Sequence, residues 1–340
     1  MRTQVRCMGR RAVSMISVII TARNAEATLT AAVESCLSQT YADLEMVLID
    51  NGSSDETRAL MDSFEDPRVR VFFSGGSHVD AHCLGVENAR GGLIARMDAD
   101  DVCHPRRFEK QVALLHADES LSGCTCGVRV CSLGREIGEG FVKYVDWLNS
   151  LQLPEDILRE RFIESPVVHP AAMVRKTALL SVGGYQEVEW AEDYDLWLRF
   201  LNAGCQIGMV PEILFDWYDS DTRLTRTDGR YSQENFLRAK AHYLAKLGDR
   251  FEICGAGPIG KRIGRFLLDE GVAVNAFYEV NPRRIGENIA GVSVLEQAAM
   301  RCDGNTILLG AVGLKGARGV IRGLAVDQGF VEGVDFFCVA

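Results

Sequence analysis

The sequence predicts an α/β protein with two domains. Short β-branched runs alternate with segments that carry apolar residues at helical spacing, which is typical of a mostly parallel sheet flanked by helices. The run from Ile16 to Ile20 is continuously apolar, as expected for a strand that is buried on both faces. The chain has 340 residues, more than one hydrophobic core normally holds, so two cores are expected.

The chain is expected to divide into three parts. Residues 1–14 are basic and lack the apolar run of a signal peptide, so we interpret them as a disordered extension. Residues 15–248 form the first predicted domain and residues 249–340 the second, with a tight junction at Gly248-Asp249-Arg250. No apolar run reaches the roughly 18–20 residues that a membrane-spanning helix needs.

Composition narrows the class of protein. The formal net charge of -10 argues against nonspecific binding to nucleic acid, so we expect no nucleic-acid partner. Eleven cysteines are scattered, without the paired spacing of a zinc site. They are interpreted as reduced thiols of a cytoplasmic protein.

Polar residues follow three of the four strands expected in the first domain, at 16–20, 46–49, 69–73 and 93–97. One edge of the sheet should therefore collect Asp50, Asp98, Asp100 and Asp101, because ligands and polar ends gather beyond the carboxyl ends of parallel strands. Two like charges about 4 Å apart repel by roughly 4 kcal/mol at an effective dielectric near 20. A hard cation, Mg²⁺ or Mn²⁺, would relieve this repulsion and also bind a diphosphate.

Four blocks of the first domain resemble the inverting family 2 glycosyltransferases with the GT-A fold. The resemblance extends from Ser17 to Tyr243 and rests on the order of these blocks: Ser17 to Asn24; Gln39-Thr40-Tyr41 with Asp50-Asn51-Gly52-Ser53; Asn88 to Gly91 leading to Asp98-Ala99-Asp100-Asp101; and Gly183-Gly184-Tyr185 followed by Glu192 to Arg199. The third block carries a DxD metal motif.

The resemblance implies roles for individual residues. The nucleotide-sugar donor would bind at Thr21, Ala22, Arg23, Asn24, Asp50 and Asp98. Within this set, Asp50 would contact the base, usually uracil, and Asp98 would lie near the ribose and diphosphate. Asp100 would bind the metal, and Asp193 would be the catalytic base that removes a proton from the acceptor hydroxyl.

The implied reaction moves one sugar, with inversion, from a nucleoside-diphosphate donor such as a UDP-sugar to a carbohydrate or lipid-linked acceptor. Surface polysaccharide or lipopolysaccharide assembly is the usual setting of such enzymes, and a lipid-linked acceptor would bring peripheral contact with a membrane. The QxxRW motif of processive synthases is absent, and the comparable region reads Phe215-Asp216-Trp217-Tyr218. Transfer of a single sugar per encounter is therefore expected.

Several polar residues have two interpretations. Arg23 could stack on a base. Asp55 is expected to cap a helix, whereas Asp101 could either cap a helix or contribute to the metal site. His169 could face the metal or acceptor, although a lone histidine is more often structural. Three arginines could close over the diphosphate or form a solvated loop: Arg223, Arg226 and Arg230.

The second domain is expected to be small and Rossmann-like. A strand at 251–254 leads into Gly255-Ala256-Gly257-Pro258-Ile259-Gly260, which fits GxGxxG, and a helix with an apolar face follows. The predicted nucleotide-binding residues are Gly255, Gly257, Gly260 and, at the end of the next strand, Glu279. The ligand could be a dinucleotide, another nucleotide, or none.

Two further functions remain open at this point. An NAD-dependent oxidoreductase would act through the second domain, and a noncatalytic nucleotide-sugar sensor would bind the donor without turnover. The presence of Asp98, Asp100 and Asp193 together favours a transferase over a sensor.

Overall fold

A computed structural model describes residues 14–340, apart from 133, 135, 222 and 315. The predicted disordered extension therefore lies outside the described residues, except for Ser14. The structure has two compact units, each considered separately below. The first comprises the described residues up to Pro154, Val167–Glu187 and Arg199–Arg223, and the second comprises Glu155–Pro166, Val188–Leu198 and Leu224–Ala340.

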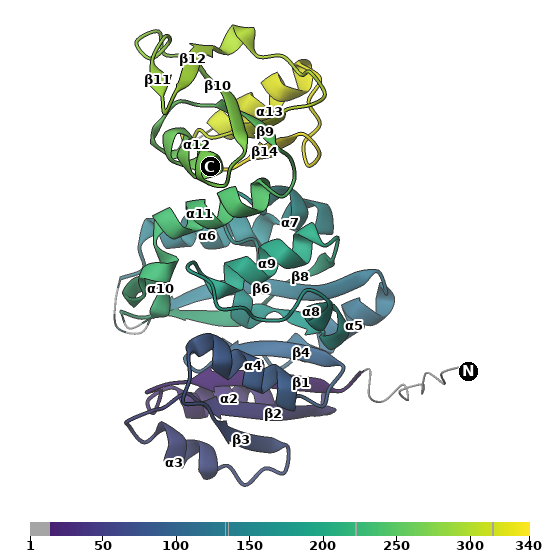
Figure 1. Ribbon diagram of the computed structural model, residues 1–340. Helices are drawn as coiled ribbons and strands as arrows, with labels where there is room; N and C mark the ends of the chain where they lie inside the picture. The colour runs from purple at the N-terminus through teal and green to yellow at the C-terminus, as the bar shows by residue number, and fades with distance from the viewer. Residues whose placement is uncertain (1–13, 133, 135, 222, 315) are drawn as a thin grey trace, which may run out of the picture. The chain divides into compact units, whose positions relative to one another are not determined.

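The first unit contains an eight-stranded sheet with the order β3-β2-β1-β4-β7-β6-β8-β5 (Figure 1). Its strands are β1 (Ile16–Ala22), β2 (Leu44–Asp50), β3 (Val69–Phe73), β4 (Leu93–Asp98), β5 (Val102–Cys103), β6 (Leu121–Ser132), β7 (Met173–Arg175) and β8 (Gln206–Asp219). Strands β3, β2, β1 and β4 are mutually parallel, and β6 is parallel to β8. Strands β7 and β5 pair antiparallel with their neighbours. The predicted mostly parallel sheet is confirmed.

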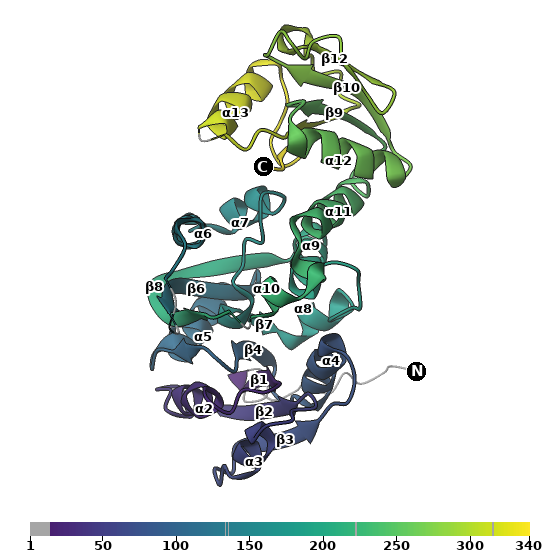
Figure 2. The ribbon, with the colours of Figure 1, turned by 90° about the vertical axis from the view of Figure 1, so that its left-hand side faces the viewer.

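Helices cover both faces of this sheet. They are α2 (Leu29–Leu37), α3 (Thr57–Asp62), α4 (His78–Asn88), α5 (Arg107–Ala117), α6 (Glu139–Ser150) and α8 (Lys176–Ser181), with a 3-10 turn η1 (His169–Ala171). Helices α2 and α4 lie on opposite sides of β1 and β2 (Figure 2). A Cβ atom on Gly85 of α4 would lie 2.5 Å from Ile19 Cγ2, so α4 can approach β1 this closely only without a side chain there.

A buried polar network ties the amino ends of the parallel strands together. The Ser17 hydroxyl donates to Glu45 Oε1 at 2.7 Å and accepts from Gly91 N at 2.8 Å. Glu45 also accepts from Arg90 N and from the Arg70 guanidinium. Burial opposes ionisation of Glu45, but these donors outweigh it, so the pKa of Glu45 is lowered. Arg90 and Gly91, part of the third family-like block, therefore serve the fold.

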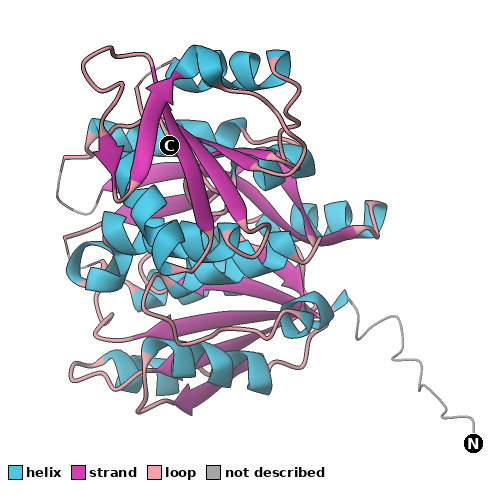
Figure 3. Ribbon diagram, turned by 45° about the horizontal axis from the view of Figure 1, so that its top comes forward, coloured by secondary structure: helices cyan, strands magenta, loops and turns pink. Residues whose placement is uncertain are grey.

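The second unit contains a six-stranded sheet with the order β11-β12-β10-β9-β13-β14. Its strands are β9 (Arg250–Cys254), β10 (Ala273–Glu279), β11 (Asn288–Ile289), β12 (Val292–Glu296), β13 (Ile307–Gly310) and β14 (Phe336–Cys338). All neighbouring pairs are parallel except β11 with β12. Helices cover this sheet as well, and Figure 3 shows helices and strands in separate colours. The helices of this sheet include α12 (Pro258–Asp269) and α13 (Ala317–Asp327).

The remaining helices belong wholly or partly to the second unit. They are α7 (Pro154–Glu160), α9 (Glu192–Asn202), α10 (Leu224–Thr227) and α11 (Gln233–Leu244), with 3-10 turns η2 (Gly229–Tyr231) and η3 (Gln297–Ala299). Tyr194 of α9 and Leu237 of α11 share one buried apolar cluster with Phe251, Ile253 and Phe277 of the six-stranded sheet. The first turns of α9 therefore pack with the C-terminal sheet, although they are remote from it in sequence. The predicted boundary near residue 249 remains a prediction.

Replacing Gly91 by alanine should destabilise the first unit. The added Cβ would lie 2.4 Å from Met15 O and 2.8 Å from Ser17 N, and backbone atoms cannot rotate away as a side chain can. We expect a loss of about 1–3 kcal/mol, measured as a lower midpoint in thermal or urea unfolding. Gly138→Ala is the control, because no heavy atom lies within 4 Å of its added Cβ. Equal stability of the two variants would contradict this account of Gly91.

Candidate functional site

The parallel register brings two predicted site residues to the end of β1. Ala22 is paired with Asp50 of β2, and Thr21 is paired with Asp98 of β4. Asp50 is buried and accepts a hydrogen bond from Ser53 N at 3.1 Å, which shapes the turn that follows β2. Neighbouring parallel strands thus place both carboxylates at the carboxyl edge of the sheet, where such sheets bind ligands.

The loops after β1 and β2 are joined by Asn24. Its backbone has φ of 56°, in the left-handed region that asparagine tolerates better than most residues. Asn24 N donates to Ser53 Oγ at 3.1 Å, and its side-chain oxygen accepts from Ser54 N at 2.8 Å. Thr21 and Ala22 are buried, whereas Arg23 is exposed beside this joint. The four residues from Thr21 to Asn24, all predicted to bind the nucleotide-sugar donor, thus form one continuous edge with Asp50.

Three carboxylates lie together in the turn after β4. Asp98, Asp100 and Asp101 each have an oxygen within 4.8 Å of the others. Burial opposes ionisation of Asp98, but the combined positive charges around it, led by the Arg96 guanidinium and including Arg223, outweigh burial, so the pKa of Asp98 is lowered. Burial, followed by the charge of Asp98, raises the pKa of Asp100 to about 6. The repulsion expected from the sequence is therefore present, and Arg96 offsets only part of it.

Asp101 is the most buried member of this acidic cluster, with 1% of its surface exposed. Its Oδ1 accepts from Tyr218 N at 2.8 Å. Helix α5 has Arg106 at its N-cap position and no side-chain capping bond, so the alternative that Asp101 caps this helix is wrong. Asp101 Oδ2 has no hydrogen-bond partner among the residues that the structure describes. An uncompensated buried carboxylate oxygen is costly, and a bound cation would satisfy it. The donor set therefore fits a hard divalent ion.

Sequence analysis did not single out Arg96, which lies inside β4. Its guanidinium contacts Asp98 Oδ1 at 2.7 Å and Thr21 Oγ1 at 3.5 Å. Only 5% of Arg96 is exposed. The signal available in the sequence was an arginine inside an otherwise apolar strand, because such a charge is rarely buried without a partner.

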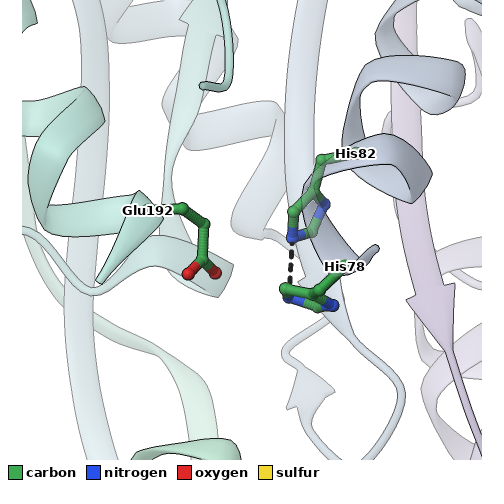
Figure 4. A group of neighbouring side chains, drawn as sticks. All are labelled: His78, His82 and Glu192. Carbon is green, nitrogen blue, oxygen red and sulfur yellow. Dashed lines mark hydrogen bonds between the residues drawn. The ribbon is translucent and has the colours of Figure 1, made fainter. Parts of the chain in front are cut away.

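A buried aromatic cluster lies in the same unit. His82 of α4 stacks on Tyr185 with ring centroids 4.6 Å apart, and Tyr185 Oη is hydrogen-bonded to His169 Nε2 at 2.9 Å. Figure 4 shows His78 and His82, whose Nε2 atoms are 2.9 Å apart. Burial, followed by the nearby Arg96 charge, lowers the pKa of His169 to about 3. His169 is therefore a neutral, buried residue, consistent with the structural interpretation.

The acidic residues at the start of α9 have different environments. Tyr231 donates its hydroxyl proton to Glu192 at 2.8 Å, and Asp195 accepts from Tyr243 Oη at 2.6 Å and Trp190 Nε1 at 3.0 Å. Glu192 and Asp195 are both buried. Asp193 is more exposed than either, as a residue that receives a substrate proton must be. The role of Asp193 as the catalytic base remains a prediction.

The other residues with two interpretations have different outcomes. Asp55 Oδ1 accepts from Thr57 N at 3.1 Å, a bond at the start of α3 that agrees with a capping role. Arg223 lies over the Trp217 ring at 4.6 Å, and its charge acts on both Asp98 and Asp100. Arg230 pairs with Asp228 at 2.7 Å. A role for these arginines or Arg226 on the diphosphate remains a prediction.

The glycine loop of the second unit, Gly255 to Gly260, packs closely against neighbouring atoms at two of its glycines and lines a cavity at the third. A Cβ on Gly255 would lie 2.5 Å from Val312 Cγ2, and one on Gly260 would lie 1.9 Å from Gly255 O. These two glycines permit the tight turn. A cavity of about 360 Å³ adjoins Gly257 and is lined by four cationic side chains: Lys261, Arg262, Arg265 and Arg284.

The end of β10 is partly occupied by its own loop. Glu279 accepts from Val280 N at 2.9 Å and Asn281 N at 3.1 Å, and it lies 3.4 Å from the Arg284 guanidinium. Arg284 Nη1 is also 3.6 Å from the position of a Cβ on Gly257. Arg284 thus links the predicted acidic residue to the glycine loop.

Comparisons with known proteins identify the family of the chain. The model of the family described as "Glycosyl transferase family 2" matches residues 17–183. The chain is 33% identical over 200 residues to the O-antigen biosynthesis glycosyltransferase WbnJ of Escherichia coli, covering 57% of this chain and 75% of WbnJ. It is 28% identical over 255 residues to the amylovoran biosynthesis glycosyltransferase AmsE of Erwinia amylovora, covering 68% of this chain and 92% of AmsE.

The fold is also that of solved glycosyltransferases. S. aureus TarS, residues 1–349, in complex with UDP, superposes with a TM-score of 0.54 at 15% identity, covering 74% of this chain and 70% of that one. The fold and the relatives together define the chain as a glycosyltransferase with a GT-A type sheet. The chain belongs to glycosyltransferase family 2.

No helix among the described residues is long and apolar enough to cross a membrane. The ten cysteines at described positions are all free thiols.

Stability should fall as the pH is lowered from about 7 to 5. Burial, followed by the positive charge of nearby His78, holds the pKa of His82 well below its usual value. The unfolded chain takes up a proton near the usual value of about 6.5, whereas folded His82 does not. Each such histidine contributes a slope of up to about 1.4 kcal/mol per pH unit.

His82→Phe should therefore reduce the slope of the unfolding free energy against pH by the contribution of about one bound proton, while the stacking on Tyr185 is kept. Urea unfolding at pH 7, 6 and 5 measures it. His116→Phe is the control, because His116 is exposed. An unchanged slope in His82→Phe would show that His82 is protonated alike in both states.

Proposed function

We propose that this family 2 enzyme transfers one sugar from a nucleoside-diphosphate donor, most simply a UDP-sugar, to an acceptor hydroxyl with inversion. The observation that carries the proposal is the acidic cluster at the carboxyl edge of the sheet, where Asp101 Oδ2 is buried without a hydrogen-bond partner among the described residues. The names of WbnJ and AmsE favour an acceptor that belongs to a surface polysaccharide or lipopolysaccharide. The free thiols at the described positions suit a reducing compartment, so we also propose a cytoplasmic enzyme.

Asp98, Asp100 and Asp101 are the residues that would hold a divalent cation, Mg²⁺ or Mn²⁺. The cation supplies positive charge that stabilises the departing diphosphate. The donor's nucleotide would lie along Thr21, Ala22, Arg23, Asn24 and Asp50, the edge that Asn24 joins through its bonds to Ser53 and Ser54. Arg223, whose charge already acts on the acidic cluster, would face the same diphosphate.

Asp193 is the proposed catalytic base. As the acceptor oxygen forms its bond to the anomeric carbon, the proton of the hydroxyl passes to the Asp193 carboxylate. The bond from the anomeric carbon to the diphosphate oxygen breaks on the opposite face, and its electron pair leaves with the diphosphate. Glu192 and Asp195 hold the start of α9 through Tyr231 and Tyr243, so they position Asp193 and do not take the proton.

A separate proposal concerns the glycine loop. The cavity beside Gly257 carries four cationic side chains, so we propose that it binds the phosphates of a nucleotide or dinucleotide. Glu279 would then receive a ribose hydroxyl. The family match and its transferase relatives leave the oxidoreductase and sensor alternatives unfavoured, so this domain is proposed to bind a ligand without catalysing a redox step.

Separate substitutions of Asp100 and Asp193 should distinguish donor binding from turnover. Asp100→Asn should weaken Mn²⁺-dependent UDP binding at least about tenfold, because it removes a charged ligand. Asp193→Asn should bind UDP and Mn²⁺ like the unmodified protein but lower the transfer rate about 100-fold or more, as loss of a general base does. Calorimetric titration and release of UDP from UDP-sugars measure the two effects.

Asp62→Asn and Asp327→Asn are matched controls on the exposed surface of each unit. Metal-independent UDP binding, or full activity of Asp193→Asn, would contradict the assigned roles.

Arg284→Ala tests the glycine loop. ADP and NAD are first tested for binding to the chain without metal. The substitution should lower the affinity for the nucleotide that binds by about tenfold, because a charge-assisted hydrogen bond is lost. Arg283→Ala is the control, because Arg283 is exposed and does not line the cavity. Failure of both nucleotides to bind in calorimetry would overturn this proposal without affecting the transferase.

A further inference from the structure

The second unit contains another cavity, separate from the cationic one and also of about 360 Å³. Its walls come from α11, from the first turn of α12, from residues 163–164 and from the chain that follows β14. Phe236, Leu237 and Ile259 provide apolar surface, and Glu164, Gln233 and Lys240 provide polar groups. An enclosure with mixed apolar and polar walls is typical of small-molecule sites.

A buried cation lies in the wall of this cavity. Only 5% of Lys240 is exposed, and its ammonium donates to Ile163 O at 2.6 Å and to Val339 O at 3.2 Å. An ammonium group has three N–H donors, so these two bonds leave capacity for a ligand. A buried lysine is rare unless its charge has a use, and here Glu164 balances it electrostatically.

One residue in the wall of this cavity contacts the helix that carries the proposed base. Tyr231 lines the cavity, and its hydroxyl donates to both oxygens of Glu192, at 2.8 and 3.0 Å. Glu192 directly precedes Asp193, and the charges of both carboxylates act on Tyr231. A ligand in the cavity would therefore lie one side chain away from the start of α9.

The lining favours a neutral saccharide as the occupant. The walls offer both donors and acceptors, as the hydroxyls of a sugar require, and the Tyr231 and Phe236 rings can cover its C–H face. One lysine balanced by one glutamate does not suit a diphosphate, in contrast to the four cations beside Gly257. The volume of about 360 Å³ lies within the range of small-molecule pockets, roughly 300–1,000 Å³.

We propose that this cavity binds the sugar of the acceptor that lies next to the reacting hydroxyl. The inference rests on the proposed transferase function and on Asp193 as its base. It gives the C-terminal domain a role in the reaction, because Ile259 and Val339 of that domain form part of the wall. Acceptor selection would then depend on residues far from the donor motifs in sequence.

The test uses the full chain with Ile259→Trp, which fills the cavity, and Ile285→Trp as the matched control on the exposed surface of the same domain. Saturation-transfer NMR measures binding of neutral methyl glycosides of glucose, galactose, mannose, N-acetylglucosamine and rhamnose. At least one should bind the unmodified chain and Ile285→Trp, and Ile259→Trp should weaken it at least tenfold. Gln233→Ala, an exposed change that preserves the fold, should weaken it about threefold or more.

UDP binding with Mn²⁺ is measured on every variant and should stay within twofold. Three outcomes would overturn the inference: no glycoside binds the unmodified chain, Ile259→Trp binds glycosides normally, or only nucleotides occupy the cavity. If UDP binds with Mn²⁺ and glycosides do not, this inference alone fails. If UDP does not bind either, the proposed transferase function fails.

Discussion

The balance of charge at the carboxyl edge of the first sheet is the constraint on which the candidate site depends. Parallel pairing of β1 with β2 and β4 brings Asp50 and Asp98 to the same edge, and the following turn adds Asp100 and Asp101. Arg96 compensates Asp98 from inside the sheet. The cluster nevertheless retains a raised pKa at Asp100 and an oxygen of Asp101 without a hydrogen-bond partner among the described residues, and these two observations are the basis of the proposed cation site.

A cluster of buried aromatic side chains lies near this charged edge. His82 and His169 are both buried with lowered pKa values, and Tyr185 joins them by stacking and by a hydrogen bond. Tyr185 follows Gly183 and Gly184, whose positive φ angles make the turn that brings it there. A family-like block thus owes part of its pattern to packing, because the turn and the aromatic cluster hold α4 beside the site.

The second unit joins the proposed base to the C-terminal domain. Tyr194 of α9 lies in the same apolar cluster as the strands of the six-stranded sheet, and Tyr243 of α11 holds Asp195. The start of α9 therefore packs in the same unit as the six-stranded sheet.

The sequence by itself determined the strands of the parallel sheet and the acidic residues at their ends, because both depend on local patterns: β-branched runs and polar residues directly after them. Its family motif also singled out Asp193 among three neighbouring acids as the proposed base. The pairing of Arg96 with Asp98, two positions apart in β4, was also local, although sequence analysis overlooked it. Only the tertiary structure revealed the burial of His82 against Tyr185 and the cavity with Lys240 and Tyr231. These features join segments about a hundred residues apart or more, and no local pattern encodes which distant side chain will cover a ring or close a cavity.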